Sequence, residues 1–423
     1  MLKAEIKYIN FSLPMDRCEK ILWVLTLLFP AVVSLKHGVS TIFYLMLLLS
    51  IYMLIQSRPK LNNMAKYMLG GFMVLILVSV LSLINADDID NGLRRIKKLA
   101  SFILLVPIFI AMVSVRTNLV KPFLIGACIG GFVLPGITIY QGYFLGYTRI
   151  TGFYNWAMFG SVAVIMALAL FCGLLFIKSK GIYRSLIYLS LLGALFAAIQ
   201  SGTRGAWIGL IAGVPLALCL SFVIGGIPKK RIMLVLLSGI LVASIAGILG
   251  EDKIISRWNA TNQAIDLYLT GSNNNTNIND RFLMWDAAIK IWLRHPVIGS
   301  GIGDFHKDYE KMLESGEAGI PGVNITPWSY AHSNYFDALA GTGILGLVCL
   351  ITSTFILPIT FFLKALKSSI NGQDRYAVVF GLVFVTAFMI FGLTENWLAH
   401  SQLVMAFSLL LAILASRFGA RVG

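Results

Sequence analysis

Long apolar runs separated by short polar connections make up most of the chain. Twelve runs can be counted, near residues 21–35, 38–56, 67–84, 99–115, 122–145, 156–177, 185–200, 206–227, 232–249, 338–363, 376–393 and 398–415. Most hold about 17–25 residues, which is long enough for a helix to cross a hydrocarbon core of about 30 Å. They lack the alternation of polar and apolar positions typical of barrel strands. Since only helices and closed barrels satisfy their backbone hydrogen bonds inside a bilayer, we predict an all-α polytopic membrane protein with about 12 transmembrane helices.

One long polar segment interrupts the apolar runs, from Gly250 to about Leu339. Amphipathic helical spacing recurs at three places within it, Ser256–Leu269, Arg281–Leu293 and Phe305–Leu313. From Trp328 onward the helical spacing resumes and leads directly into the tenth run. We therefore predict three parts: transmembrane helices over 1–249, a helical loop that caps the membrane surface over 250–338, and transmembrane helices over 339–423.

The distribution of charge indicates on which side of the membrane each part lies. With the N-terminus inside, the inner connections hold 20 Lys and Arg against 4 acidic residues, and the outer segments hold 14 against 15. An excess of Lys and Arg on the cytoplasmic side is the general rule for membrane proteins. The net charge of +15 is thus explained by topology and does not indicate nucleic-acid binding. The loop 250–338 is expected on the periplasmic side of a bacterial inner membrane.

Composition and the missing motifs exclude several classes of function. Hydrophobic residues make up 58% of the chain and its mean hydropathy is +0.82, which is too apolar for a soluble fold. The five cysteines are scattered without CxxC spacing, so neither a disulfide framework nor a cysteine metal site is indicated. A Walker loop, a GxGxxG turn in a βαβ unit and an HExxH helix are all absent. We expect no ATP-driven or nicotinamide-linked activity, no cofactor and no bound metal.

One basic cluster is an exception to the excess of Lys and Arg on the cytoplasmic side. Arg94, Lys97 and Lys98 lie on the outer side, just before the fourth run. Their spacing places them on one face of a helix. Asp87, Asp88 and Asp90 could simply neutralise them, or the cluster could bind an anionic lipid or sugar phosphate at the outer leaflet. The aspartates themselves could form a solvated acidic loop or a divalent-cation site.

Two histidines are candidates for acid–base chemistry. His332 stands where the polar loop becomes a membrane helix, with Ser333 and Asn334 directly after it. Histidine suits a general base because its unperturbed pKa lies near about 6.5. At such a position it could equally be a structural hydrogen-bonding residue. His400, beside Glu395 near the outer end of the last two helices, is the strongest competitor.

Three outward arginines suggest a site for an anion. Arg204, within Ser201–Trp207, lies at the membrane boundary in a very short outer connection. Ionisable groups at that depth are candidates for function, although a long side chain can also reach the interface without one. Arg149 follows the fifth run, and Arg281 begins a helix of the loop. Since guanidinium groups pair well with phosphate oxygens, the three together favour a phosphate site.

These segments resemble the bacterial O-antigen ligase family, which shares a domain with O-antigen polymerases and with some protein-targeting oligosaccharyltransferases. The matching segments are Arg149–Asn155 (RITGFYN), Ser201–Trp207 (SGTRGAW), Arg281 with Trp285 followed by Pro296–Gly303, and His332–Phe336 (HSNYF) with Gly341–Gly346. Many members continue the first motif with Pro-Asn, where this chain has Trp156 and Ala157. No role is therefore carried over for that turn.

The resemblance implies a membrane glycosyltransferase of GT-C-like architecture. Its donor would be O-antigen linked to undecaprenyl pyrophosphate, and its acceptor a sugar hydroxyl of the lipid A–core oligosaccharide in lipopolysaccharide biosynthesis. The reaction would be inverting and independent of metal and ATP, and membrane lipids would be its surroundings. An O-antigen polymerase with the same donor is the first alternative. A transporter of polyprenyl-linked glycan is the second, although intramembrane charges and inverted repeats are not evident in this sequence.

On this basis we assign expected roles to the candidate residues. His332 is the expected general base, and Arg204 and Arg281 are expected to bind the pyrophosphate and stabilise the charge that builds on it. Arg149 is expected to contact the same group, and Asn334 to contact substrate. Arg94 and Lys98 are expected to hold the phosphorylated acceptor.

Overall fold

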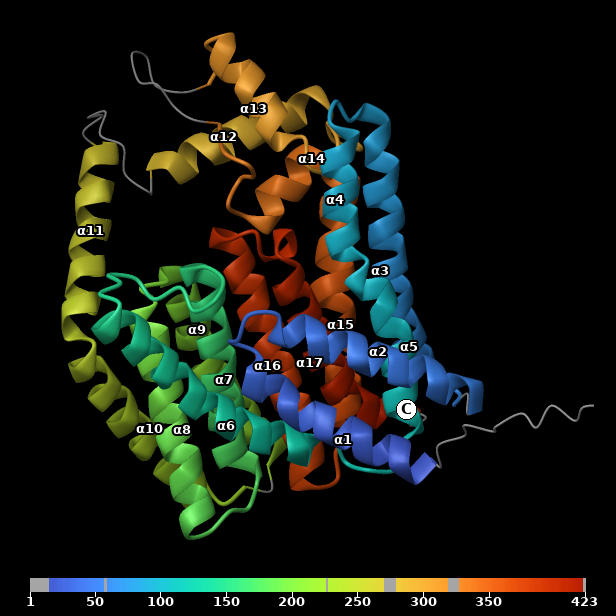
Figure 1. The fold of residues 1–423 in the computed structure, drawn as a ribbon, viewed down its shortest axis with the longest axis vertical. Helices are drawn as coiled ribbons and strands as arrows, with labels where there is room; N and C mark the ends of the chain where they lie inside the picture. The colour runs from blue at the N-terminus through green and yellow to red at the C-terminus, as the bar shows by residue number, and fades with distance from the viewer. Residues whose placement is uncertain (1–14, 57–58, 226, 270–278, 319–326, 421–423) are drawn as a thin grey trace, which may run out of the picture.

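The computed structural model describes residues 15–56, 59–225, 227–269, 279–318 and 327–420, and within these ranges it contains helices and no strands (Figure 1). The α-helices of the first part are α1 (Met15–Val32), α2 (Gly38–Gln56), α3 (Asn63–Leu81), α4 (Ile89–Leu99), α5 (Ser101–Ser114), α6 (Val120–Ile139), α7 (Trp156–Phe176), α8 (Ile182–Gln200), α9 (Arg204–Ile224) and α10 (Lys229–Leu249). The remaining α-helices are α11 (Glu251–Leu269), α12 (Asn279–Arg294), α13 (Phe305–Glu314), α14 (Asn334–Ile351), α15 (Leu357–Leu366), α16 (Gly372–Thr394) and α17 (Ser401–Ala415). Five short helical segments extend or join them, η1 (Ser82–Asn85), η2 (Tyr140–Phe144), η3 (Thr352–Ile356), η4 (Trp397–Ala399) and η5 (Ser416–Phe418).

Eleven helical spans in the described part of the chain are long and apolar enough to cross a membrane, which confirms the all-α polytopic fold. The first of the twelve predicted runs corresponds to α1, which is not among the eleven. This helix has only 18 residues and begins with charged side chains between Asp16 and Lys20. It packs against α2 and α6.

The centre of the bundle is formed by α7, α16 and α17. Every residue of α7 from Ala157 to Phe176 is buried. Aromatic rings join α16 to the last helix: the ring of Phe388 lies 5.1 Å from that of Phe407 and 4.9 Å from that of Trp397. The peripheral helices α9 and α10 bury far less of their apolar surface. Since lipid solvates apolar side chains as well as protein does, tight van der Waals packing rather than the hydrophobic effect holds such helices together.

Glycine allows the helices around α6 to approach closely. A Cβ at Gly126 would lie 1.9 Å from the carbonyl oxygen of Leu27 on α1, and one at Gly131 would lie 2.7 Å from that of Ser190 on α8. Small residues at helix contacts are typical of membrane bundles. The sequence of α6 therefore fixes its place between α1 and α8.

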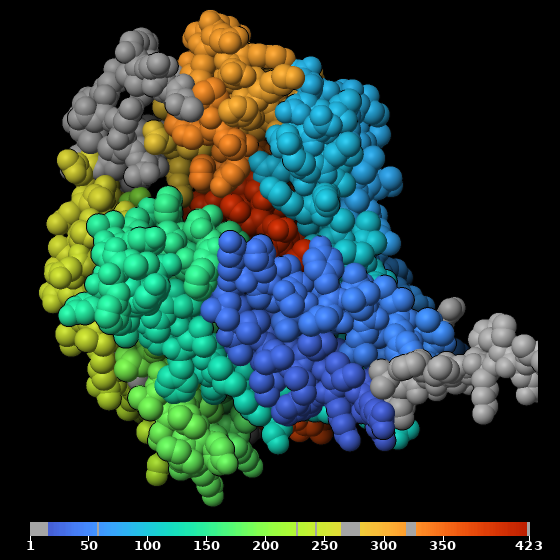
Figure 2. Space-filling model, viewed as in Figure 1, coloured from blue at the N-terminus to red at the C-terminus, as the bar shows by residue number. Residues whose placement is uncertain are grey.

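The cap consists mainly of α12 and α13, which lie above the bundle in Figure 1. It has a hydrophobic core of its own, formed by Met284, Ala287, Ala288, Ile291, Phe305, Tyr309, Met312, Ala331 and Ala340. Trp285 of α12 stacks on Phe336 of α14, with ring centroids 5.0 Å apart. Figure 2 shows the C-terminal part of the chain at the floor of a recess between the cap, the α3–α5 segment and the helices α1 and α6.

Two of the sequence motifs pair with each other at the base of the cap. The helix α14 is broken at Gly343, whose φ is +64°. The break frees backbone groups, and the loop Pro296–Gly303 satisfies them: Ser300 N donates to Ala340 O over 3.0 Å, and Ile344 N donates to Pro296 O over 3.0 Å. Unpaired backbone groups at membrane depth are very costly. The glycine-rich loop is therefore required by the kink of α14.

A second connection ties the cap to α4. The carboxylate of Asp304 accepts hydrogen bonds from the backbone N–H groups of Asp87 and Asp88, the latter over 3.0 Å. Asp87 also forms an ion pair with Lys311 of α13, and Asp88 caps α4 by accepting from Asn91 N over 2.9 Å. These contacts account for two of the three aspartates, and no group of three metal-ligating side chains occurs in the described ranges.

Candidate active site

The segment 327–333 leads from the cap into α14 and is not helical, so the helix predicted from Trp328 onward is wrong over these residues. Neighbouring elements hold its backbone. Ala331 N donates to Oδ1 of Asp337 over 3.2 Å, and Ala331 O accepts from Nε1 of Trp285 over 3.0 Å. Because the backbone N–H and C=O of Ala331 are both hydrogen-bonded to side chains, α14 cannot extend toward the N-terminus through this residue.

His332 is fixed in an unusual backbone conformation. Its φ is +47°, in the left-handed region that residues other than glycine rarely adopt. Such strain costs about 1–3 kcal/mol and persists only where the surroundings impose it. Here the following residue, Ser333, donates its hydroxyl to Gly392 O over 3.1 Å. This hydrogen bond fixes the residue after His332 against the end of α16.

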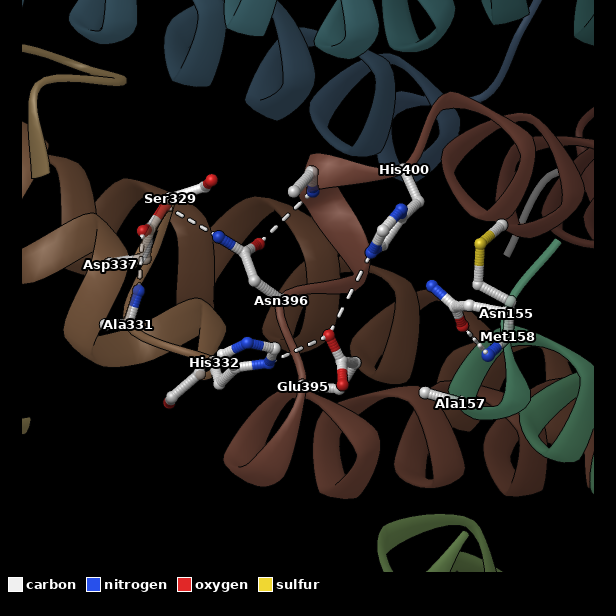
Figure 3. Close-up of polar contacts among 12 residues, drawn as sticks. Asn155, Ala157, Met158, Ser329, Ala331, His332, Asp337, Glu395, Asn396 and His400 are labelled. Carbon is white, nitrogen blue, oxygen red and sulfur yellow. Dashed lines mark hydrogen bonds and ion pairs between the residues drawn. The ribbon is translucent and has the colours of Figure 1, made fainter. Parts of the chain in front are cut away.

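A partly buried carboxylate, with 13% of its side chain exposed, lies between the two candidate histidines (Figure 3). Oε1 of Glu395 is 3.4 Å from Nδ1 of His332 and 3.9 Å from Nε2 of His400. Burial acts to raise the pKa of Glu395, but interaction with the two histidines outweighs it and lowers the pKa to about 2. A carboxylate at Nδ1 orients the imidazole and leaves Nε2 of His332 available as a base.

His332 lines a cavity of about 360 Å³ that four arginines share with it: Arg149, Arg204, Arg257 and Arg281. They come from four different places, the turn after α6, the first residue of α9, the middle of α11 and the first turn of α12. Two carboxylates, Asp280 and Glu395, also line this cavity. Four guanidinium groups against two carboxylates leave an excess of positive charge facing the cavity. His400 is not among the lining residues.

Contacts within the protein hold the arginines only in part. The guanidinium of Arg149 lies 4.2 Å above the ring of Trp156, and NH1 of Arg204 donates to Oγ1 of Thr261 over 2.6 Å. Arg257 packs on Gly202, where a Cβ would lie 2.8 Å from Nε. The buried Nε atoms of Arg149 and Arg257 have no hydrogen-bond partner among the described residues. These donors are available to a ligand with several acceptor oxygens.

Burial and mutual repulsion make this cluster of cations costly. Burial, then the nearby Arg257, Arg204 and Arg281, lower the pKa of Arg149 to about 10. Burial also lowers the pKa of Arg257 and of Arg281. Since guanidinium groups nevertheless stay charged near neutral pH, an anion in the cavity would relieve the repulsion. The geometry is that of a site for an anion with several oxygens.

Comparison with protein families identifies this region. Residues 189–351 match the model of the O-antigen ligase family. Over these residues the chain is similar to O-antigen ligases. That range includes α9, the cap and all of α14, and with them Arg204, Arg257, Arg281 and His332. The chain is also similar to a Haemophilus influenzae protein described as uncharacterized, with 22% identity over 354 residues that cover 82% of this chain and 85% of the relative.

The structure brings together four of the residues selected from the sequence. His332, Arg204 and Arg281 of the matched range line the cavity, and Arg149 reaches it from outside that range. Asn155, from the same motif as Arg149, caps α7 by accepting from Met158 N over 2.8 Å (Figure 3).

The other three selected residues do not line this cavity. Asn334 is buried, and its Oδ1 accepts from Leu398 N over 3.3 Å. Arg94 is exposed and Lys98 is half-buried, both on α4. Arg95, which lies next to this basic cluster, contacts the segment that contains His332. Its guanidinium donates to Ser329 O over 3.1 Å.

Sequence reasoning missed Arg257, Glu395 and Asp280 as members of the site. Arg257 lies on a helix whose spacing indicated only an amphipathic face, and nothing in the pattern showed that α11 rises beside α9. Glu395 was noted only as a neighbour of His400. Asp280 directly precedes the helix predicted over Arg281–Leu293, and the structure places it inside the first turn of α12, which begins at Asn279. The usable signal was the presence of carboxylates at the outer ends of helices beside histidines.

Proposed function

We propose that the protein is an O-antigen ligase that transfers a saccharide from a polyprenyl pyrophosphate, undecaprenyl pyrophosphate in bacteria, to a sugar hydroxyl of lipid A–core oligosaccharide. The observation that carries the proposal is the cavity that four arginines share with one histidine, which is held by a partly buried carboxylate. The similarity to O-antigen ligases supports the class of reaction. The cap and the basic inner connections support a site on the periplasmic face of the inner membrane.

The arginines are proposed to hold the pyrophosphate of the donor. Arg204 and Arg281 bind its oxygens, and Arg149 and Arg257 contribute the Nε donors that have no partner among the described residues. As the bond between the anomeric carbon and the phosphate oxygen breaks, negative charge collects on that oxygen. Cationic donors fixed in a partly buried site stabilise this charge more strongly than water does.

His332 is proposed to act as the general base. Its Nε2 accepts the proton of the acceptor hydroxyl while the hydroxyl oxygen forms a bond to the anomeric carbon. The polyprenyl pyrophosphate departs with the electron pair of the broken bond, from the face opposite the attacking oxygen, so the configuration is inverted. Glu395 at Nδ1 orients the ring and stabilises the imidazolium that results.

The remaining selected residues receive different roles. Arg94 and Lys98 lie on α4, which belongs to the α3–α5 segment beside the recess in Figure 2, and they are proposed to bind phosphate groups of the acceptor. Asn334 is buried beneath the His332 segment, so we propose that it supports η4 rather than touches substrate. Surrounding membrane lipid accommodates the polyprenyl chain.

Transfer by purified protein in lipid nanodiscs tests this proposal, with polyprenyl-pyrophosphate glycan as donor, lipid A–core as acceptor and EDTA present. We expect product from the wild type, none from His332→Ala or Arg204→Ala, and a KM for donor about tenfold higher in Arg257→Ala, because one charge-assisted hydrogen bond contributes about 1.5 kcal/mol. Arg294→Ala, which removes a cap arginine paired with Glu317, is the matched control.

The outcomes separate the alternatives. Normal turnover by His332→Ala would show that another group takes the proton, and Asp280 and Glu395 are the carboxylates on the cavity that could do so. Chain growth between two lipid-linked saccharides, without transfer to lipid A–core, would make the protein an O-antigen polymerase with the same donor site. Movement of the donor across the bilayer without transfer would make it a transporter.

A further inference from the structure

Arg95 is a buried cation on the inner face of α4. Only 8% of its surface is exposed, whereas Arg94 beside it is exposed. NH2 of Arg95 donates to the carbonyl oxygen of Ser329 over 3.1 Å, and the guanidinium carbon lies 5.2 Å from the ring centroid of Tyr330. Both partners belong to the non-helical segment 327–333.

Tyr330 connects Arg95 to the histidines. Its ring centroid lies 4.6 Å from that of His332 and 6.1 Å from that of His400. Burial, then the nearby Glu395 carboxylate, raise the pKa of Tyr330. Tyr330 is therefore packed between the guanidinium on one side and the pair of Glu395 and His332 on the other.

The charge of Arg95 makes this contact demanding. No carboxylate of the described residues lies within ion-pair distance of it. A buried cation without an ion pair depends on hydrogen-bond acceptors and aromatic ring faces for its stability. If the segment moved away, the guanidinium would lose the Ser329 carbonyl and the Tyr330 ring together. Moving the segment therefore costs free energy, because these contacts at Ser329 and Tyr330 would be lost just before the left-handed residue His332.

We propose that Arg95 is a positioning residue for His332, which acts by clamping Ser329 and Tyr330 so that the imidazole stays against Glu395 and faces the cavity. The inference rests on the proposed role of His332 as the base. It gives α4 two roles, because the outer face carries the proposed acceptor contacts Arg94 and Lys98 and the inner face holds the base. The planar guanidinium is required, because a lysine cannot cover the ring and reach the carbonyl at once.

The experiment compares wild type, Arg95→Ala and Arg95→Lys as full-length protein in nanodiscs. In the transfer assay we expect kcat of Arg95→Ala to fall on the order of 10- to 100-fold, the effect of a small misplacement of a catalytic group, with KM for donor unchanged. Arg95→Lys should lie between the two. Arg184→Ala is the control, since Arg184 also lies over a tyrosine ring, that of Tyr188, far from the cavity.

A second readout does not depend on activity. Diethyl pyrocarbonate modifies unprotonated imidazole, and mass spectrometry gives the rate at the peptide that contains His332. We expect this rate to be several-fold higher in Arg95→Ala than in the wild type and unchanged in Arg184→Ala. Wild-type kcat together with a wild-type rate at His332 in Arg95→Ala would overturn the proposal.

Two further results are decisive in their own way. If Arg95→Ala does not fold, as judged by size-exclusion chromatography and thermal unfolding, Arg95→Lys decides, and wild-type values for both readouts in that variant sink the proposal. Full transfer by His332→Ala would remove the proposed base and leave the modification rates to show whether Arg95 holds the segment. Failure of the proposed function and failure of the clamp are thus distinguishable.

Discussion

At the scale of single residues, position on the cavity distinguishes two histidines that share one carboxylate. Glu395 contacts both His332 and His400, but only His332 lines the cavity that contains the arginines. The sequence placed both histidines at the outer ends of helices and, apart from the family resemblance, left the choice between them open. It could not be made from spacing, because His332 and Glu395 are brought together by the packing of α14 on α16.

The pKa of Glu395 predicts a pH dependence of stability. Its folded value of about 2 lies below the ordinary 4.5, so the carboxylate contributes stability that is fully present above pH 4.5 and is lost as the pH falls toward 2. We expect wild type to unfold at a higher temperature than Glu395→Gln near neutral pH, and the difference to shrink over that window. Thermal unfolding in detergent as a function of pH measures it. A difference that stays constant through the acid range would show that the effect of Glu395→Gln is not one of charge.

The arginines show how far residue-level prediction reached. Arg149, Arg204 and Arg281 were selected as outward cations whose guanidinium groups suit phosphate oxygens, and the structure places all three on one cavity. Arg257 has the same chemistry but sits within a helix of mixed composition, so its position facing the cavity depends on how α11 rises from α10. Asn334 was selected as a substrate contact because it follows His332 in the sequence, but it is buried and its Oδ1 accepts from Leu398 N over 3.3 Å.

At the scale of elements, the kink of α14 and the glycine-rich loop beneath the cap depend on each other. A Cβ at Gly299, where φ is +73°, would lie 2.3 Å from the carbonyl carbon of Gly341. The sequence marked both segments as motifs, but their glycines alone could not show that they pair. The helix predicted from Trp328 is wrong for a related reason. Its apolar spacing is helical, but hydrogen bonds of the Ala331 backbone with the side chains of Trp285 and Asp337 hold this segment in a non-helical conformation.

This pairing predicts a large difference between two glycine substitutions. At Gly316, with φ +75°, a Cβ would have no atom within 4 Å of it, so Gly316→Ala should cost only the left-handed penalty of about 1–2 kcal/mol. Gly299→Ala carries the same penalty and in addition overpacks the loop against α14, which costs about 1–3 kcal/mol more. Denaturant or thermal unfolding of the two variants gives the comparison. Equal stabilities would mean that the loop and α14 separate easily.

At the scale of the whole molecule, the apolar runs predicted the helices well because the bilayer permits few other structures. Eleven of the twelve runs correspond to spans, and α1 differs because charges occupy its first turns. What the pattern could not give is the arrangement of the spans, since their apolar faces are nearly uniform. The buried centre of α7, α16 and α17 depends on small residues and aromatic contacts that have no period of their own.

The orientation of the molecule remains a prediction, and cysteine labelling tests it. The charge distribution places the cap outside and the connection between α7 and α8 inside. After replacement of the five native cysteines, which are all free, single cysteines are introduced at Ser315 in the cap and at Lys180 in that connection, both of which are exposed. A maleimide that crosses the outer membrane but not the inner one should label Ser315→Cys in intact cells and label Lys180→Cys only after permeabilisation.

The reverse pattern would place the cavity and its arginines on the cytoplasmic side. A pyrophosphate-linked donor displayed at the outer leaflet could not then reach them, and the proposed transfer to lipid A–core would be impossible in cells even if the purified protein performed it. Retained transfer activity of both single-cysteine variants is the control that the labelled molecules are folded. Orientation is therefore the property of the whole chain on which the chemistry of His332 depends.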